Sequence, residues 1–155
     1  GLHLDIVGGG WWHDRLTAHA ERLGIADAVT FHGHVDDVTK HQVVQRCWVH
    51  LLPSRKEGWG LAVVEAAQHA VPTIGYRSSG GLTDSIVDGV TGILVDNSRE
   101  LTERLEELLA DDVLREELGR KAQARTAEFS WRQSADAMLG VLQAVTSGRR
   151  VSGLQ

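Results

Sequence analysis

The sequence predicts an α/β fold in which a Rossmann-like parallel sheet is flanked by helices and followed by a helical carboxy-terminal region. Short apolar segments alternate with helical patterns up to Val95, and this alternation favours parallel strands joined by crossover helices. Glycine-rich or charged loops follow the predicted strands. Ligands of such sheets bind beyond the carboxyl ends of the strands, so we expect a site there.

Each predicted element rests on periodicity and on the turn residues that bound it. Three glycines end the first strand, Gly24 ends the first helix, and Pro72 stands where a strand tolerates proline. The expected order is strand 2–7, helix 11–23, strand 28–31, a helix capped by Asp36 or Asp37, strand 48–52, a helix from Leu61, strand 71–75, a short helix over 80–87 and strand 91–95.

The remainder of the chain predicts three amphipathic helices. Asn97 to Glu100 is typical of a capping box, and leucines follow it at helical spacing. A second helix is expected over 111–128, and Ser130 can cap a third whose apolar face begins with Trp131.

Composition limits the classes of function. The chain has 155 residues, 42% of them hydrophobic, which suits one globular domain with a real core. A formal net charge of −5 without a basic cluster argues against a nucleic-acid partner. A single cysteine excludes an internal disulfide framework and, with no apolar run long enough to span a bilayer, predicts a cytoplasmic protein.

The segment from Pro53 to Ala67 organises the functional prediction. An apolar strand ends at Pro53, a loop with two glycines follows, and an apolar helix begins at Leu61. The amino end of such a helix points backbone N–H groups and a positive dipole outward, which suits a phosphate or diphosphate. Glu57 lies before the turn, and Glu65 lies one helical turn beyond Leu61 on the same face.

This segment resembles the E-x7-E signature of retaining nucleotide-sugar glycosyltransferases with two Rossmann domains, the GT-B type, in particular family four. Further segments resemble the same family in the same order, over roughly positions 4–147. They are Ile6–Gly10, Val29–Val35, Gly80–Gly81, Asp88–Val95 and Phe129–Trp131.

The resemblance implies a role for each residue of the loop. Glu57 is then the catalytic candidate, which lies near the donor sugar and orients or stabilises it. Glu65 accepts hydrogen bonds from the ribose hydroxyls, which are donors. Arg55 offsets phosphate charge, although a solvated role is equally open. The backbone N–H groups of four donor-binding residues receive sugar hydroxyls and the distal phosphate: Gly58, Trp59, Gly60 and Leu61.

The segment from Gly33 to Lys40 resembles the base-binding region of the family. Val35 would pack on the base, while Asp37 and Lys40 would contact its edge. A carboxylate suits the ring N–H and amine of guanine, a hint toward a GDP-sugar over a UDP-sugar. A helix cap and a surface lysine are the equally open structural reading.

We expect neither a metal nor a bound cofactor; the donor sugar nucleotide is a substrate. His32 and His34 are the closest histidine pair, but they lack a third ligand at a recognisable spacing. The glycines at 8–10 do not complete a dinucleotide fingerprint, because Trp11, Trp12 and His13 follow them and the last glycine is missing.

The resemblance implies that residues 1–147 form the carboxy-terminal nucleotide-sugar-binding domain and that 148–155 form a frayed tail. The acceptor domain and the first strand and helix of the donor domain would precede them, and a carboxy-terminal helix would cross back to the acceptor domain. The implied enzyme is a hexosyltransferase, cytoplasmic or peripheral at the inner face of the membrane. Its isolated donor domain would have little or no activity. A non-catalytic nucleotide-sugar-binding module and a GT-B-type epimerase remain as alternatives.

Overall fold

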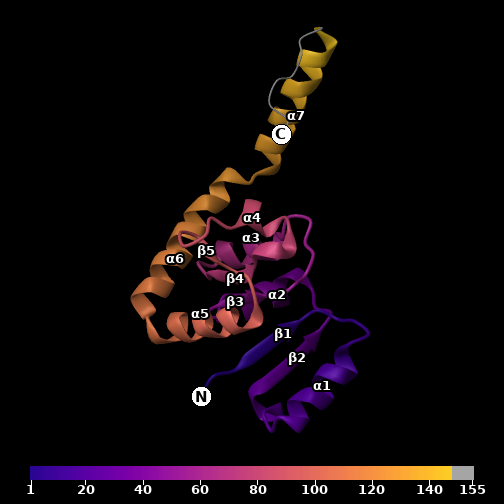
Figure 1. Cartoon of the computed structure of the whole chain (residues 1–155). Helices are drawn as coiled ribbons and strands as arrows, with labels where there is room; N and C mark the ends of the chain where they lie inside the picture. The colour runs from indigo at the N-terminus through magenta and orange to yellow at the C-terminus, as the bar shows by residue number, and fades with distance from the viewer. Residues whose placement is uncertain (148–155) are drawn as a thin grey trace. The chain divides into compact units, whose positions relative to one another are not determined.

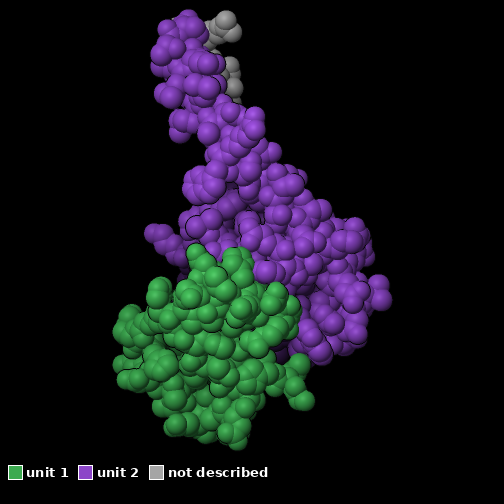
Figure 2. Space-filling model, turned by 180° about the vertical axis from the view of Figure 1, so that it is seen from behind, with its two compact units in different colours: residues 1–47 green, residues 48–155 purple. Residues whose placement is uncertain are grey.

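The computed structural model describes residues 1–147, shown in Figure 1. These residues fall into two compact units, coloured separately in Figure 2. Unit 1 comprises Gly1–Cys47, and unit 2 begins at Trp48. The tail expected at 148–155 lies outside the described residues, and the assignment of 1–147 to one functional domain stays a prediction.

Unit 1 pairs two parallel strands, with Leu4 opposite Val29. Its elements are β1 (Leu4–Val7), α1 (His13–Arg22), the 3-10 helix η1 (Ala26–Ala28), β2 (Val29–Gly33) and α2 (Asp37–Val44). The first helix was predicted to start at Trp11 but begins at His13, whose N–H donates to the carbonyl of Gly10 at 3.1 Å. Asp36 caps α2, accepting from the N–H of Thr39 at 2.7 Å.

Unit 2 contains a parallel sheet in the order β3-β4-β5 and most of the helices. Its elements are β3 (His50–Leu52), α3 (Leu61–Gln68), β4 (Thr73–Tyr76), the 3-10 helix η2 (Arg77–Ser79), α4 (Leu82–Ser85), β5 (Gly92–Val95), α5 (Ser98–Ala110), α6 (Asp112–Arg125), the 3-10 helix η3 (Thr126–Glu128) and α7 (Trp131–Thr146). The prediction of parallel strands flanked by helices is confirmed, although the strands form two sheets, one in each unit.

Two apolar clusters cover opposite faces of the β3-β4-β5 sheet, because successive strand residues point to opposite sides. Leu94 joins one cluster, whose other buried members are Val63 of α3, Leu82 of α4 and Ile86. Its neighbour Val95 joins the other cluster, with Ile74 and the helical residues Leu108 and Leu118. Helices α3 and α4 therefore lie on one face of this sheet, and α5 and α6 contribute to the other.

The helix caps predicted for α5 and α7 are confirmed. The side chain of Asn97 accepts from the N–H of Glu100 at 3.0 Å, and Ser130 accepts from the N–H of Gln133 at 3.1 Å. Helix α7 buries none of its residues, and Trp131 is 93% exposed. Across residues 1–147, no helix is both long and apolar enough to traverse a bilayer.

Candidate functional site

The loop between β3 and α3 delivers the chain to the amino end of a helix that lacks a side-chain cap. Gly60 precedes α3 with φ of +81°, a left-handed conformation that favours glycine. A Cβ at this position would also come within 2.6 Å of the Leu82 side chain. The turn therefore depends on glycine for both conformation and space.

A second loop, between β4 and α4, holds this first loop through its backbone. The N–H of Glu57 donates to the carbonyl of Ser79 at 2.8 Å, and the N–H of Gly81 donates to the carbonyl of Glu57 at 3.2 Å. The hydroxyl of Ser79 donates to the carbonyl of Ser54. Both loops follow strands of the same parallel sheet, so they meet at its carboxyl edge, the edge at which the sequence predicts a ligand site.

Gly81 is the point of closest approach between the two loops. A Cβ there would lie 2.0 Å from the carbonyl oxygen of Gly58 and 2.6 Å from the Cα of Trp59. Both are backbone atoms, which a rotamer change cannot move. Only glycine at position 81 permits this backbone arrangement.

The two carboxylates of the E-x7-E segment are both partly buried. Glu65 lies on α3, which buries Val63, Ala66 and Ala67 on its inner side. Leu61, one turn earlier on the face of Glu65, is 70% exposed. Glu65 is therefore not an interior residue, and its face of the helix extends to the solvent-exposed start of α3.

The pKa of His50, a histidine on β3, depends on burial and on the charge of Glu65. Burial lowers the pKa of His50 to about 4, and the Glu65 carboxylate opposes this by favouring the charged imidazole. The Nδ1 atom of His50 lies 3.0 Å from the hydroxyl oxygen of the buried Thr73. His50 is therefore neutral at pH 7.

The basic side chains of the loop are accessible. Arg55 and Lys56 are both exposed. Within residues 1–147, neither forms an ion pair with a carboxylate. Their charges can therefore meet an anionic ligand without first breaking an internal pair.

The predicted base-contacting residues lie at the start of α2 in unit 1. The Nζ atom of Lys40 donates to Asp37 at 2.9 Å, and this hydrogen bond holds the pKa of the exposed Asp37 carboxyl below its usual range. Val35 is partly buried just before the helix. The sequence left the cap open between two aspartates; Asp36 makes it, which leaves Asp37 for the ion pair.

The described residues do not form a metal centre. Across residues 1–147, no group of three or more His, Cys, Asp and Glu side chains is arranged to hold a metal ion. His32, considered above as half of a chelating pair, instead lies 2.6 Å from Asp5 on the neighbouring strand. This contact links β1 to β2.

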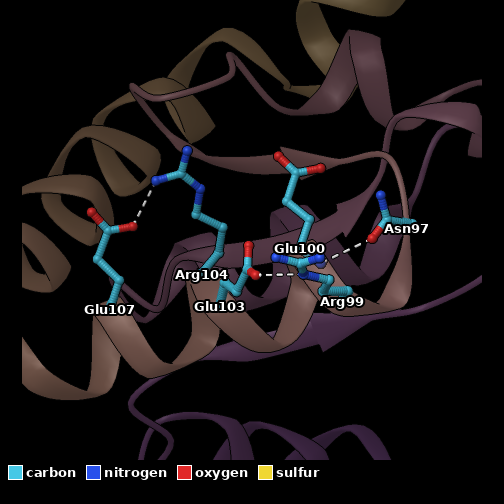
Figure 3. A pocket seen from close by; sticks show the side chains of 6 residues that line it. All are labelled: Asn97, Arg99, Glu100, Glu103, Arg104 and Glu107. Atoms are coloured by element: carbon cyan, nitrogen blue, oxygen red, sulfur yellow. Dashed lines mark hydrogen bonds and ion pairs between the residues drawn. The ribbon is translucent and has the colours of Figure 1, made fainter.

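An open depression of about 560 Å³ lies along α5 (Figure 3). Its lining residues are Asn97, Arg99, Glu100, Glu103, Arg104 and Glu107. Both arginines are engaged by carboxylates of the same helix, Arg99 by Glu103 at 2.8 Å and Arg104 by Glu107 at 2.7 Å. The three glutamates outnumber the arginines, so this surface does not suit a diphosphate.

The sequence did not identify the residues that support the loop. Trp59 packs edge-on against Phe129, with ring centroids 4.7 Å apart and an interplanar angle of 83°. The guanidinium of Arg125 lies 5.1 Å from the centre of the Phe129 ring. The segment Phe129–Trp131 was recognised only as part of the resemblance, and nothing in its local pattern points to Trp59.

These features define a parallel α/β domain with a glycine-dependent loop and a helix amino end at the carboxyl edge of its sheet, an architecture shared with GT-B glycosyltransferases. The family described as glycosyl transferases group 1 matches residues 1–125. The chain therefore belongs to this family.

Curated relatives carry the name D-inositol 3-phosphate glycosyltransferase. The protein from Acidothermus cellulolyticus is 33% identical over 144 residues, which cover 92% of this chain and 32% of the relative. The protein from Gordonia bronchialis is 37% identical over 141 residues, covering 86% of this chain and 31% of the relative. The chain thus spans about a third of the length of these relatives.

Solved structures share the fold. The sucrose-phosphate synthase of Thermosynechococcus elongatus superposes with a TM-score of 0.84 at 26% identity, covering 94% of this chain and 39% of that protein. HepE of Anabaena, crystallised with UDP and glucose, superposes with a TM-score of 0.81 at 22% identity, covering 92% of this chain and 40% of HepE. Both likenesses support the GT-B assignment of the fold.

Proposed function

We propose that this chain binds the nucleoside diphosphate sugar of a retaining glycosyltransferase and presents it for transfer to an acceptor hydroxyl. One observation carries the proposal: Glu57 and the uncapped amino end of α3 share a loop whose backbone is fixed by hydrogen bonds to Ser79 and Gly81. Fixed N–H dipoles at a helix amino end favour a diphosphate, because they need little reorganisation when charge develops on the leaving group.

The donor has four parts, and each matches a group with suitable chemistry. Glu65 accepts from the ribose hydroxyls, and Glu57 orients the sugar. The N–H groups of Gly58, Trp59, Gly60 and Leu61 receive the distal phosphate and sugar hydroxyls, and the accessible Arg55 offsets phosphate charge. Val35, Asp37 and Lys40 of unit 1 contact the base, in a UDP- or GDP-sugar.

The acceptor site belongs to a preceding domain of the longer enzyme. Helix α7 supports the presence of another domain, because its exposed apolar residues, among them Met138 and Leu142, suit packing against one. On this proposal the 155-residue chain binds donor but has little or no transferase activity by itself. The names of the curated relatives make D-inositol 3-phosphate the first acceptor to test with the full-length enzyme.

Calorimetric titration of this chain with UDP- and GDP-sugars tests the proposal. Glu65→Gln keeps the shape of the side chain but removes its charge, and we expect donor affinity to fall by roughly tenfold to a hundredfold, as for a charged hydrogen bond. Glu106→Gln, on the exposed side of α5, is the matched control and should bind like the wild type. Equal affinities for wild type and Glu65→Gln would contradict the ribose assignment.

Product analysis separates transfer from the alternatives. The full-length enzyme should move the sugar to an acceptor with the anomeric configuration kept. Donor binding without any transferred product would favour a binding module, and a changed sugar stereochemistry in the nucleotide pool would favour an epimerase.

A further inference from the structure

The junction between α6 and α7 contacts residues 53–60, which we call the donor loop, where the ring of Phe129 meets that of Trp59. We call Trp59, Phe129 and Arg125 together the aromatic bracket. The edge-to-face contact of Trp59 with Phe129 has ring centroids 4.7 Å apart. Arg125 lies against the same Phe129 ring, 5.1 Å from its centre. Edge-to-face pairs and cation–π contacts are favourable when partly desolvated, and all three side chains are partly buried.

Arg125 also attaches this bracket to α4. Its two terminal nitrogens donate to the carbonyls of Ser85, at 2.8 Å, and Asp84, at 2.9 Å. These carbonyls lie at the carboxyl end of α4, where backbone acceptors lack partners within the helix and where a cation interacts favourably with the helix dipole.

The other end of α4, its amino end, also contacts the donor loop. Leu82, the first residue of α4, is fully buried and lies beneath Gly60, the residue after Trp59. The donor loop is therefore held at two points. The start of α4 contacts Gly60, and the ring of Phe129 contacts Trp59. Arg125, which lies against the Phe129 ring, is bonded to the end of α4.

We propose that Phe129 and Arg125 are positioning residues for donor binding: they hold Trp59, and with it the backbone from Glu57 to Gly60, in the conformation that receives the diphosphate and sugar. The inference rests on the proposed function of the loop. It assigns to the α6–α7 junction a role in donor affinity that acts through Trp59.

The physical basis is the population of the competent loop. A ligand that binds one conformation has an apparent affinity reduced by the fraction of molecules in that conformation. Losing the aromatic contact lets Trp59 leave its place, so the loop spends more time in other conformations. Because the binding groups themselves are intact, the loss appears as weakened donor affinity.

Arg115, at the other end of the same helix, provides a matched control. Its guanidinium lies 4.8 Å from the ring centre of Trp48, and it donates to the carbonyl of Leu108 at 2.8 Å. It thus repeats the chemistry of Arg125, an aromatic contact together with a bond to a helix carbonyl, without touching the donor loop. Replacing either arginine by lysine removes the planar guanidinium group but keeps the positive charge.

The test combines donor calorimetry with ¹⁹F NMR of the chain labelled with 5-fluorotryptophan, the Trp48 and Trp59 resonances being assigned with Trp→Phe variants. We expect Phe129→Leu and Arg125→Lys each to shift the Trp59 resonance and to weaken donor binding by about fivefold, equivalent to about 1 kcal/mol. Phe129→Tyr retains the ring and should bind within about twofold of the wild type. Arg115→Lys should shift the Trp48 resonance and leave donor affinity unchanged.

The outcomes separate the inference from the proposed function. Wild-type affinity in Phe129→Leu, with the Trp59 resonance shifted, would overturn the positioning role while the donor site stands. Equal loss of affinity in Arg115→Lys and Arg125→Lys would also overturn it, because a general loss of stability would then explain both. A wild-type chain that binds none of the donors would instead overturn the proposed function itself.

Discussion

Two segments that follow strands, one in each unit, are built in opposite ways. In the segment 33–40 of unit 1, charged side chains engage one another or the backbone: Lys40 pairs with Asp37, and Asp36 caps α2. In the loop 53–60 of unit 2, the backbone is held by hydrogen bonds to the neighbouring loop, while the cations of Arg55 and Lys56 stay exposed.

On the proposed function, the two segments contribute differently to donor binding. A base that binds at segment 33–40 must compete with the Lys40–Asp37 ion pair, so only a base with matching donors and acceptors gains from the exchange. A ligand that meets the loop of unit 2 finds fixed N–H groups and accessible cations, which suit any diphosphate. Three experiments test this difference between the two units.

The largest effect should come from Gly81→Ala, which removes the close approach of the two loops in unit 2. The new Cβ would lie 2.0 Å from the carbonyl oxygen of Gly58, so the backbone must move. We expect a loss of about 2–3 kcal/mol of stability and at least about a tenfold loss of donor affinity, measured by thermal unfolding and calorimetry.

Gly10→Ala in unit 1 is the matched control for this change. Gly10 lies in the glycine-rich turn after β1, and a Cβ there would meet no atom within 4 Å. Stability and donor affinity should stay close to wild type. If Gly81→Ala and Gly10→Ala had the same stability and donor affinity, the close contact between the two loops of unit 2 would not be what determines donor binding.

A smaller effect should appear when the pH falls, and unit 2 should respond first. Burial lowers the pKa of His50 to about 4 in the folded chain. As pH falls through 6.5, His50 therefore binds a proton in the unfolded chain but not in the folded chain. The stability linked to this histidine is therefore complete above pH 6.5 and is lost as pH falls toward 4. Between pH 7 and pH 5 the loss is at most about 2 kcal/mol.

Asp36 in unit 1 also loses its contribution as pH falls, but only at a lower pH. Hydrogen bonds from Thr39 lower the pKa of Asp36, so its contribution persists at pH 5 and disappears only as pH falls through its lowered pKa. Amide hydrogen exchange at pH 7 and pH 5, corrected for intrinsic rates, should show unit 2 destabilised and unit 1 little changed. NMR titration of the His50 ring should give a midpoint near 4, lower still in Glu65→Gln; a midpoint near 6.5 would refute the buried neutral state.

The sequence predicted the elements well because each carries its own local signal. Periodicity, Gly24, Asn97 and Ser130 determine where helices begin and end, and the start of α3 at Leu61 follows from the glycines before it. What it could not predict are contacts between residues distant along the chain. Neither Gly81 against Gly58 nor Phe129 against Trp59 has any local signature, because packing of separate elements creates them.

The alternation of strands and helices also led to the wrong number of sheets. Strands alternating with helices predicted a single sheet, but alternation specifies which strands are parallel and not which strands pair. The choice of cap at α2 was likewise open between two adjacent aspartates of equal capping ability. Only the backbone geometry settles it: the extended Asp36 accepts from Thr39, while Asp37 is already helical.

The smallest effect should come from Lys40→Met, which breaks the ion pair of unit 1. An exposed pair on one helix face contributes little to stability, so the melting temperature should stay within error of wild type. The hydrogen bond from Lys40 is the largest cause of the lowered pKa of Asp37, so this pKa should rise toward its ordinary value, measurable by ¹³C NMR of the carboxyl group. An unchanged pKa of Asp37 would show that Lys40 does not hold this carboxylate, and unit 1 would then present Asp37 as freely as unit 2 presents Arg55.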